Sequence, residues 1–559
     1  MIHVIVENES AYRFLRHGRF AGKDVTWHTT SPWLLEKLPQ LGEKVLSLEE
    51  QSRLEDRDRL CWASMDFADT IADYLDKICA PFADGLKVGQ AMRREIQVNS
   101  YALLYKGMLF DMWQKDFRSS EGLAVVGNKD LIQLQAFSLM VGRFDTLFAA
   151  IAAGANIEGV EFIHHAAGQG EEIIKKINRE DIGATEKILY FLNTDLSAFL
   201  YFLWGALRKR NIFKTNFLKW GRSNNDQTVY FLRRCELLYE TFLPLLKKGV
   251  GIAQMNARFD TGIQKAPTPS LEIDLKELQV KITETLRESF YGQGITFNNS
   301  YEACAEIFYR RFVDALAYTK SLIQVLPTTF KAYQQYQSNH TALATNVLMR
   351  YSERLLQQYL INQGIPVFSM EHGVTAGLEG KTEDCHHRLD ATVGGDDMVC
   401  FSETSLKLHC IDREQKQGIA AGAPSVNRSI PYYPVQRFIA RRKLGLKNKE
   451  RVIFYLALVA RNNQVVGPKY YTDLEFYRYT KKLTTEVFSD IKDPCIFKLY
   501  PASRYLDADP FGELIKMPSN VKVLQYFEFS LLRAAADVVI LSSPQSTFGW
   551  ACSIRSRKK

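Results

Sequence analysis

The sequence lacks the features of a secreted, disulfide-stabilised or membrane-spanning protein. Its nine cysteines are scattered and odd in number, which favours free thiols in a reducing compartment. The first residues, Met1 to Asn8, contain neither a basic segment nor a cleavage site, so they predict a strand and not a signal peptide. The strongest apolar run, Phe199 to Leu207, is far shorter than the roughly 20 residues that a spanning helix needs. We therefore expect a cytoplasmic protein. Peripheral association with the cytoplasmic face of the inner membrane stays open, because Arg208-Lys209-Arg210 follows this run.

Motifs for nucleic-acid and metal binding are also missing. The chain has no paired Cys/His spacing of a zinc finger, no basic helix with heptads and no aromatic RNA-binding signature. Its net charge of +8 over 559 residues is a modest bias that suits an anionic substrate or a membrane surface. The adjacent histidines His164 and His165 follow an apolar run, and neighbours on a strand point to opposite faces. We expect no nucleic-acid partner, no metal and no cofactor.

The first 48 residues read as the opening of a Rossmann-like domain. Three short runs, Ile2–Val6, Val25–His28 and Val45–Leu48, are mostly apolar and do not alternate, which is typical of parallel strands covered on both faces. Ser31 followed by Pro32 is a helix start signal, because serine caps the first turn and proline suits its first position.

The rest of the chain predicts a second domain of the same class. A length of 559 residues exceeds one hydrophobic core and favours two to four domains. Spacing of three and four residues between apolar side chains predicts helices over much of 55–330 and over 342–363. Apolar runs predict strands at 123–126, 365–370, 398–401, 418–421, 452–456, 495–499, 521–524 and 538–541. We predict an α/β protein with an N-terminal Rossmann-like domain at 1–425, which contains a helical insertion at about 55–330, and a C-terminal Rossmann-like domain at 426–559, with 425–448 as the linker.

Polar and cationic residues follow several of the predicted strands. In an open α/β sheet, such groups at the carboxyl ends of strands hold phosphorylated ligands, and a helix that starts there adds backbone N–H donors. The candidates for phosphate binding are Arg461, Asn462, Lys498, Tyr500, Arg504, Ser542, Ser543, Ser546 and Thr547. Simple capping by Ser and Thr, and solvated basic turns, are the competing interpretations. A further polar turn, Glu371-His372-Gly373, follows the predicted strand at 365–370.

Together these motifs resemble those of bacterial surface-polysaccharide glycosyltransferases of the GT-B fold, in which two Rossmann-like domains face a cleft. The nearest groups use CMP-activated acidic sugars of the sialic-acid or Kdo type, and CDP-glycerol glycerophosphotransferases are similar more loosely. The resemblance covers roughly 345–550. It rests on Glu371-His372-Gly373, Gly422-Ala423-Pro424, Lys498-Leu499-Tyr500-Pro501, Arg504-Tyr505 and the run from Ser542 to Trp550.

The resemblance implies roles for these residues. The C-terminal domain would hold the nucleotide, with Lys498 and Arg504 neutralising the leaving phosphate. Glu371 or His372 would take the proton of the acceptor hydroxyl, or His372 would contact the donor phosphate and leave Glu371 as the base. The chain departs from the family in having Tyr500 where many members have histidine before proline. It also ends soon after Trp550, so a shortened C-terminal domain is an alternative.

Three functions remain open from the sequence. The first is a metal-independent glycosyltransferase that moves a sugar, with a CMP-linked acidic sugar as first choice, to a glycan or lipid-linked acceptor. The second is transfer of a polyol phosphate from a CDP donor. The third is an inactive or non-catalytic subunit of the same glycan-assembly machinery.

Overall fold

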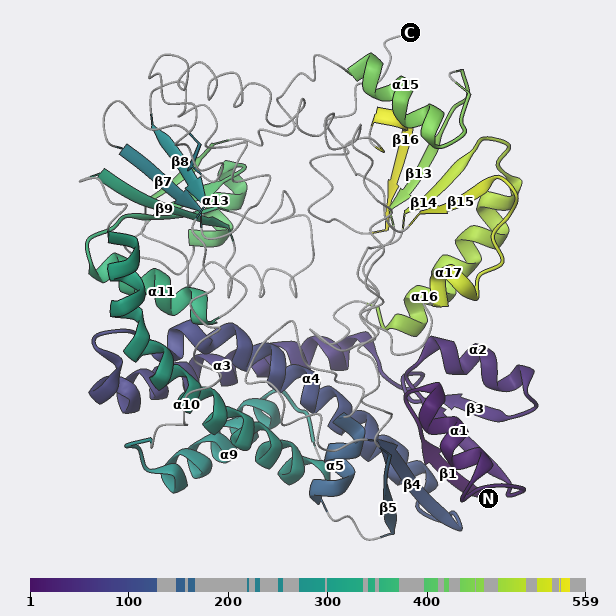
Figure 1. Ribbon diagram of the computed structural model, residues 1–559. Coiled ribbons are helices and arrows are strands. Elements are labelled where there is room, and N and C mark those ends of the chain that lie inside the picture. The colour runs from purple at the N-terminus through teal and green to yellow at the C-terminus, as the bar shows by residue number, and fades with distance from the viewer. Residues whose placement is uncertain are drawn as a thin grey trace.

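The protein is an α/β protein with parallel sheets. The computed structural model describes residues 1–127, 147–155, 159–165, 219–220, 227–231, 250–254, 271–296, 299–334, 340–346, 351–370, 397–410, 417–421, 433–447, 449–456, 471–498, 510–524, 532 and 534–542. Within these ranges the strands form three sheets of five, seven and four strands. In Figure 1 the four-stranded sheet lies above the N-terminal sheet on the right, the seven-stranded sheet lies at the upper left, and a layer of long helices runs below. No helix in the described part of the chain is both long enough and apolar enough to cross a bilayer.

The first sheet has the strand order of a Rossmann-like domain. Its strands are β1 (Ile2–Ile5), β2 (Val25–Thr29), β3 (Lys44–Ser47), β4 (Gly122–Gly127) and β5 (Val160–His164). They are parallel in the order β3-β2-β1-β4-β5. Helix α1 (Glu9–His17) is capped by Asn8, whose Oδ1 accepts from Ala11 N at 2.8 Å. Ser31 caps α2 (Pro32–Gln40) in the same way, as the sequence predicts. The three predicted N-terminal strands are confirmed.

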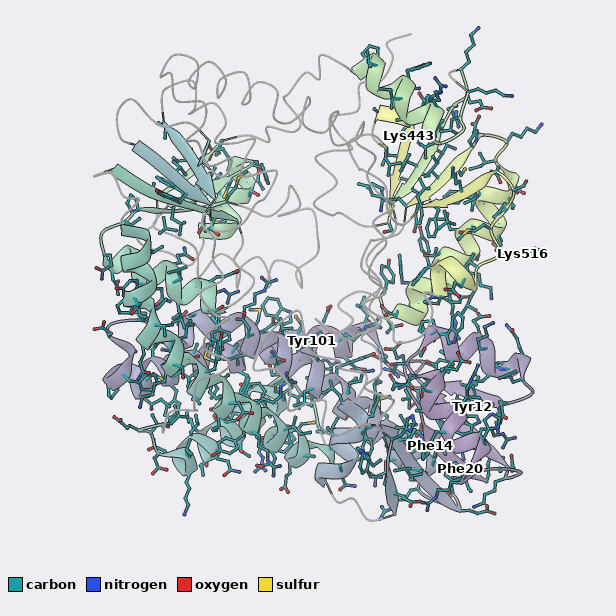
Figure 2. All side chains as sticks on the ribbon, viewed as in Figure 1. Tyr12, Phe14, Phe20, Tyr101, Lys443 and Lys516 are labelled. Atoms are coloured by element: carbon teal, nitrogen blue, oxygen red, sulfur yellow. The ribbon has the colours of Figure 1, made fainter. Side chains whose placement is uncertain are left out.

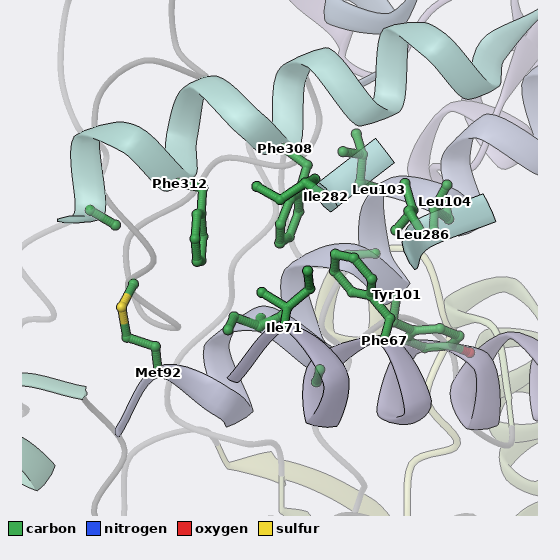
Figure 3. Packing of buried hydrophobic residues seen from close by; sticks show 14 of the residues in the cluster. Phe67, Ile71, Met92, Tyr101, Leu103, Leu104, Ile282, Leu286, Phe308 and Phe312 are labelled. Carbon is green, nitrogen blue, oxygen red and sulfur yellow. The ribbon is translucent and has the colours of Figure 1, made fainter. Parts of the chain in front are cut away.

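The long helices form the largest apolar core. They are α3 (Leu54–Ala83), α4 (Val88–Phe117), α5 (Leu147–Ala155), α9 (Leu275–Gly292), α10 (Ser300–Gln334) and α11 (Tyr351–Asn362). Figure 3 shows Phe67 of α3 and Phe308 of α10 within this core, and their rings meet edge to face at 5.2 Å. Gly89 lets α4 cross α3 closely, because a Cβ there would lie 1.8 Å from the carbonyl oxygen of Ala72. The predicted helical stretch at about 55–330 thus contains long helices, and the strand predicted at 123–126 is confirmed as β4. Strand β5 also lies inside this stretch and completes the first sheet.

The second sheet gathers strands from the middle of the chain. Its members are β6 (Lys219–Trp220), β7 (Gln227–Phe231), β8 (Gly251–Gln254), β9 (His340–Asn346), β10 (Val367–Met370), β11 (Asp397–Cys400) and β12 (Gln417–Ala420). Their order is β12-β11-β10-β9-β7-β8-β6, and only the β6–β8 pair is antiparallel. Helix α13 (Glu403–Cys410) joins β11 to β12. The predicted strands at 365–370, 398–401 and 418–421 are confirmed to within two residues.

Two helix predictions fail in this sheet. Residues 342–346 and 227–231 are strands, although their spacing predicts helix, and residues 251–254 add a further strand inside the expected helical insertion. Leu343 and Ala344 are buried because β9 lies between β10 and β7, so residues that suit one helix face fill the interior of a sheet instead. The helix begins only at Tyr351 and stops before Gly364, whose φ of +75° suits glycine.

The third sheet forms the C-terminal unit. Its strands β13 (Ile453–Leu456), β14 (Cys495–Lys498), β15 (Val521–Leu524) and β16 (Val538–Leu541) are parallel in the order β15-β14-β13-β16, and all four are predicted by the sequence. Helix α15 (Tyr433–Lys443) occupies the predicted linker. Helix α16 (Asp473–Lys482) continues through a π turn at Leu483–Val487 and a 3-10 turn at Phe488–Asp490, and α17 (Pro510–Glu513) precedes β15.

Both faces of the third sheet are covered, which explains its continuous apolar strands. On one face Ile453 and Tyr455 pack with Phe476 and Tyr477 of α16. On the other face Phe454 and Leu456 pack against α15 and against Leu532 and Ala535. The described part of the chain up to Ala420 therefore holds two sheets, where the sequence analysis expects one Rossmann-like domain.

Candidate functional site

The carboxyl edge of the third sheet brings together two of the predicted phosphate-binding residues. In the register of the sheet, Leu456 at the end of β13 pairs with Lys498 on β14 and with Leu541 on β16. Two strand spacings of nearly 5 Å place Lys498 and Leu541 about 10 Å apart on either side of Leu456. Ser542 follows directly, and its backbone N–H donates to the carbonyl oxygen of Leu456 at 3.2 Å. Lys498 and Ser542 are both partly exposed.

This edge contains the point at which the strand order reverses. From β13 the chain adds β14 and β15 on one side, and then returns to add β16 on the other side. In open parallel sheets the loops after the two strands at such a point diverge and leave a crevice, where ligands bind. Ser542 ends one of these two strands, and Lys498 ends the strand next to the other.

Aromatic side chains pack closely below this edge. Tyr455 on β13 stacks on Phe497 of β14 with ring centroids 5.1 Å apart, and Phe488 meets Tyr455 edge to face at 5.6 Å. Burial raises the pKa of Tyr455 far above its ordinary value, so its hydroxyl stays protonated. The strand ends that carry Lys498 and Ser542 are therefore held by a packed layer and not by loops.

Most of the predicted site lies outside the described residues. Of the candidates, Glu371, His372, Arg461, Asn462, Tyr500, Arg504, Ser543, Ser546 and Thr547 are not described. Their positions in the chain relate to described strands: Glu371 comes next after Met370, the last residue of β10 in the centre of the second sheet. Lys498 and Ser542 are thus the two candidates whose placement is given, and both lie at one edge of one sheet.

The first sheet has a polar cluster at the same kind of edge, which the sequence analysis misses. Glu7 follows β1, Thr30 follows β2, and Lys106 reaches them from α4. Lys106 Nζ donates to Thr30 Oγ1 at 2.9 Å and lies 3.5 Å from Glu7 Oε2, while Thr30 donates to Glu7 through both its N–H and its hydroxyl. Lys106 is 1% exposed and also sits over the ring of Phe148 at 4.6 Å. A lysine inside the apolar run from Leu103 to Leu109 is the sequence signal for this cluster.

A second buried carboxyl, Glu49, extends the cluster towards the C-terminal unit. Tyr105 donates its hydroxyl hydrogen to Glu49 Oε1 at 3.3 Å. The pKa of Glu49 is raised to about 8, mainly by burial; Lys106 opposes this shift, and the nearby carboxylates of Asp473 and Glu7 contribute to it. Glu49 therefore carries a proton at neutral pH, next to the start of α16, where Asp473 is also buried.

Helix α16 joins the third sheet to the first domain through three ion pairs. The guanidinium of Arg57 in α3 donates to both carboxylate oxygens of Glu475, at 3.0 and 3.3 Å. One turn and two turns further on, Arg478 pairs with Glu50 at 2.9 Å and Lys481 pairs with Glu36 at 2.9 Å. Glu475 also completes a capping box with Thr472, so the residue that Arg57 binds fixes the start of α16. We call these three pairs the α16 seam.

The adjacent histidines His164 and His165 have different surroundings. His164 ends β5, and His165 Nε2 lies 3.2 Å from the hydroxyl oxygen of Ser10 at the start of α1, with its ring stacked on Phe14. Burial lowers the pKa of His165, and His164 lowers it further. Within the described ranges, no group of three His, Cys, Asp or Glu side chains gathers in an arrangement that could hold a metal ion.

Comparison of the chain with models of known protein families and with curated proteins gave no match.

Proposed function

We propose that the protein is a glycosyltransferase that uses a nucleotide-activated sugar and binds the donor phosphates at the carboxyl edge of the third sheet. One observation carries this proposal: Lys498 and Ser542 flank the end of β13 at the reversal of the strand order. An ammonium group and a hydroxyl at such an edge suit a phosphate-bearing ligand. The sequence resemblance supports a nucleotide sugar as that ligand, with a CMP-linked acidic sugar as first choice.

In the proposed reaction the protein stabilises a leaving phosphate. The acceptor hydroxyl oxygen attacks the anomeric carbon, the bond from that carbon to the phosphate oxygen breaks, and the nucleotide leaves with the electron pair. Lys498 stabilises the negative charge that grows on the phosphate. The proton of the acceptor hydroxyl passes to Glu371 or His372, the predicted base.

Within this proposal the second sheet takes the role of the acceptor domain. The predicted base residues come immediately after β10, which is flanked by β9 and β11 in that sheet. The carboxyl edge of the first sheet is occupied by Lys106 and Glu7, which are both buried. A GT-B arrangement would therefore pair the second and third sheets across the donor site. The first sheet would support the third sheet through the α16 seam.

Nucleotide binding by single variants tests the donor site. Calorimetry with CMP, CDP and UDP should show binding of one nucleotide by the native protein, and the same nucleotide should raise the melting temperature. Lys498→Ala should weaken this binding by about 1.5–3 kcal/mol, the usual contribution of a hydrogen bond to a charged group. Lys516→Ala is the matched control, because Lys516 is exposed and precedes β15 at the opposite edge of the sheet. Absence of binding to all three nucleotides by folded protein would favour the non-catalytic subunit.

The product identifies the type of transfer. After incubation with CMP- and CDP-activated donors and a lipid-linked glycan, mass spectrometry separates a transferred sugar from a transferred polyol phosphate. His372→Ala should abolish transfer while leaving the melting temperature unchanged, and near-normal activity would reject the role given to His372. We expect this activity in the cytoplasm, at the membrane that carries the acceptor.

A further inference from the structure

Two histidines lie buried on one face of the first sheet. His3 of β1 and His28 of β2 are 6% and 2% exposed. Side chains alternate along a strand, and the register pairs Ile5 with His28, so both rings lie on the face that Ile5 turns towards the long helices. The other face of the sheet carries an apolar cluster, and Figure 2 shows two of its side chains, Tyr12 and Phe20, near α1. The histidine pair is therefore a polar contact within an otherwise largely apolar interior.

The two rings bind each other and pack against the last turns of α4. His3 Nδ1 lies 2.9 Å from His28 Nε2, within hydrogen-bond distance. The His3 ring is stacked on Phe117 with ring centroids 4.1 Å apart, and the His28 ring meets Trp113 edge to face at 6.0 Å. Neither of these α4 side chains carries a charge. The pair thus joins two strands of the sheet to the end of the helix that stops at Phe117.

The chemistry of imidazole limits the number of protons that this pair can hold. A hydrogen bond between two imidazoles needs an N–H on one ring and a lone pair on the other. Two neutral rings meet this condition, and so does one imidazolium beside a neutral ring. When both rings are charged, each nitrogen at the contact carries a hydrogen, so the hydrogen bond is lost and two like charges lie side by side. The contact therefore tolerates no more than one added proton.

The surroundings of the pair oppose protonation as well. The pKa of His28 is lowered to about 3, mainly by burial, with contributions from His3 and Lys44. The pKa of His3 is also lowered, mainly by burial and then by Lys44 of β3 and the amino group of Met1, whereas Asp24 opposes this shift. In the unfolded chain both rings titrate near the ordinary histidine pKa of 6.5. The stabilisation by neutral rings is therefore present above pH 6.5 and is lost as the pH falls below it.

We propose that the His3–His28 pair is an acid-sensitive contact, which holds the end of α4 on the first sheet at neutral pH and releases it when both rings are charged. The release concerns the last turns of α4 and the turn that follows, which lead into β4 at Gly122. The earlier turns of α4 stay in the core of the long helices. The inference rests on residues 1–127, which the structure describes without a gap, and it does not depend on the donor site.

Hydrogen exchange of the full-length protein, measured by mass spectrometry of its peptides, tests the proposal. An imidazole that stays neutral in the closed state and titrates at its ordinary pKa in the open state raises the opening constant about tenfold between pH 7.5 and pH 5.5. Peptides from the last turns of α4 should therefore lose about tenfold to hundredfold in protection, after correction for the intrinsic pH dependence of exchange. Peptides from α3 should lose much less. An equal loss in α3, or no loss at the end of α4, would overturn the proposal.

Two variants at one position identify the group that titrates. His28→Gln keeps an amide that can bond to His3, and His28→Phe keeps an aromatic ring beside Trp113, so one of them serves if the other does not fold. Each should reduce the pH-dependent loss of protection at the end of α4 by about a factor of ten, because one titrating ring is removed. His17→Gln is the matched control, since His17 is exposed in the last turn of α1, and it should behave like the native protein. An unchanged pH dependence in the His28 variants, or an equal change in the control, would contradict the proposal.

Discussion

The first and third sheets have similar strand orders, but the charged side chains at their carboxyl edges differ in burial. At the first edge, Glu7 and Lys106 are buried and matched to each other, with Thr30 between them. At the third edge, Lys498 and Ser542 are partly exposed at the ends of β14 and β16, on either side of β13. Both sheets reverse their strand order next to the first strand, so topology alone gives each of them a place for a ligand.

The comparison shows that the side chains at an edge decide how that edge is used. Helix α4 places Lys106 at the carboxyl edge of the first sheet, where Lys106 pairs with Glu7. This buried ion pair occupies the position that a ligand would take, so the edge is part of the core. At the third edge Lys498 is partly exposed and not buried as Lys106 is. Stability should therefore depend on the first edge, and ligand affinity on the third edge.

The largest expected effect is on stability at the first edge. Lys106→Met removes one partner of a buried ion pair and leaves the carboxylate of Glu7 in the interior, so unfolding by denaturant should show a loss of about 3–5 kcal/mol. The double variant Glu7→Gln/Lys106→Met should regain much of this loss, because no uncompensated charge remains. A loss below 1 kcal/mol for the single variant would show that the buried Glu7–Lys106 pair does not stabilise this edge.

The next effect is a dependence of stability on pH through Glu49. Its pKa is about 8 in the folded protein and near the ordinary value of 4.5 in the unfolded chain, so the folded state binds the proton more tightly. The stabilisation is complete below pH 4.5 and is lost as the pH rises through 8, with a slope of at most about 1.4 kcal/mol per pH unit. Glu49→Gln should flatten this part of the profile of melting temperature against pH. An unchanged profile in the variant would contradict the assignment.

A substitution at the third edge should change stability less than Lys106→Met does. Lys498→Ala should lower the free energy of unfolding by about 0.5–1.5 kcal/mol, the usual contribution of one polar interaction, although it weakens nucleotide binding. Chemical denaturation of the native protein and the variant, without nucleotide, measures this difference. A destabilisation comparable to that of Lys106→Met would mean that both edges are structural.

The smallest effect belongs to the exposed pairs of the α16 seam. Arg478→Ala and Lys481→Ala should each cost about 0–1 kcal/mol, because their ion pairs are open to solvent. Arg57→Ala should cost more, since Arg57 is buried and binds both oxygens of Glu475. Limited proteolysis between the two units should follow the same order. Equal rates of proteolysis for all three variants would contradict a larger contribution of Arg57 to the α16 seam.

Sequence patterns predict the local elements well wherever the signal is local. The strands from Ile2 and Val25 and the four C-terminal strands are found because each is a short apolar run covered on both faces. Residues 342–346 are missed because their burial depends on β7 and β10, which come from distant parts of the chain. The same reason hides the cluster around Lys106, since Glu7 and Thr30 meet it only after α4 crosses the sheet edge. Of the predicted site, sequence order alone places Lys498 and Ser542 at strand ends, and only the register shows that they lie on either side of the end of β13.

The α16 seam also has a consequence for synthesis. Its partners are separated by 418, 428 and 445 positions along the chain. At about 5–20 residues per second, the ribosome releases Glu36 and Glu50 roughly 20–90 seconds before Lys481 and Arg478 of α16 emerge. During that interval the acidic surface around Glu36 and Glu50 is open to solvent and to other chains. The protein should therefore mature by docking of the C-terminal unit onto the first sheet and its helices, which are made earlier.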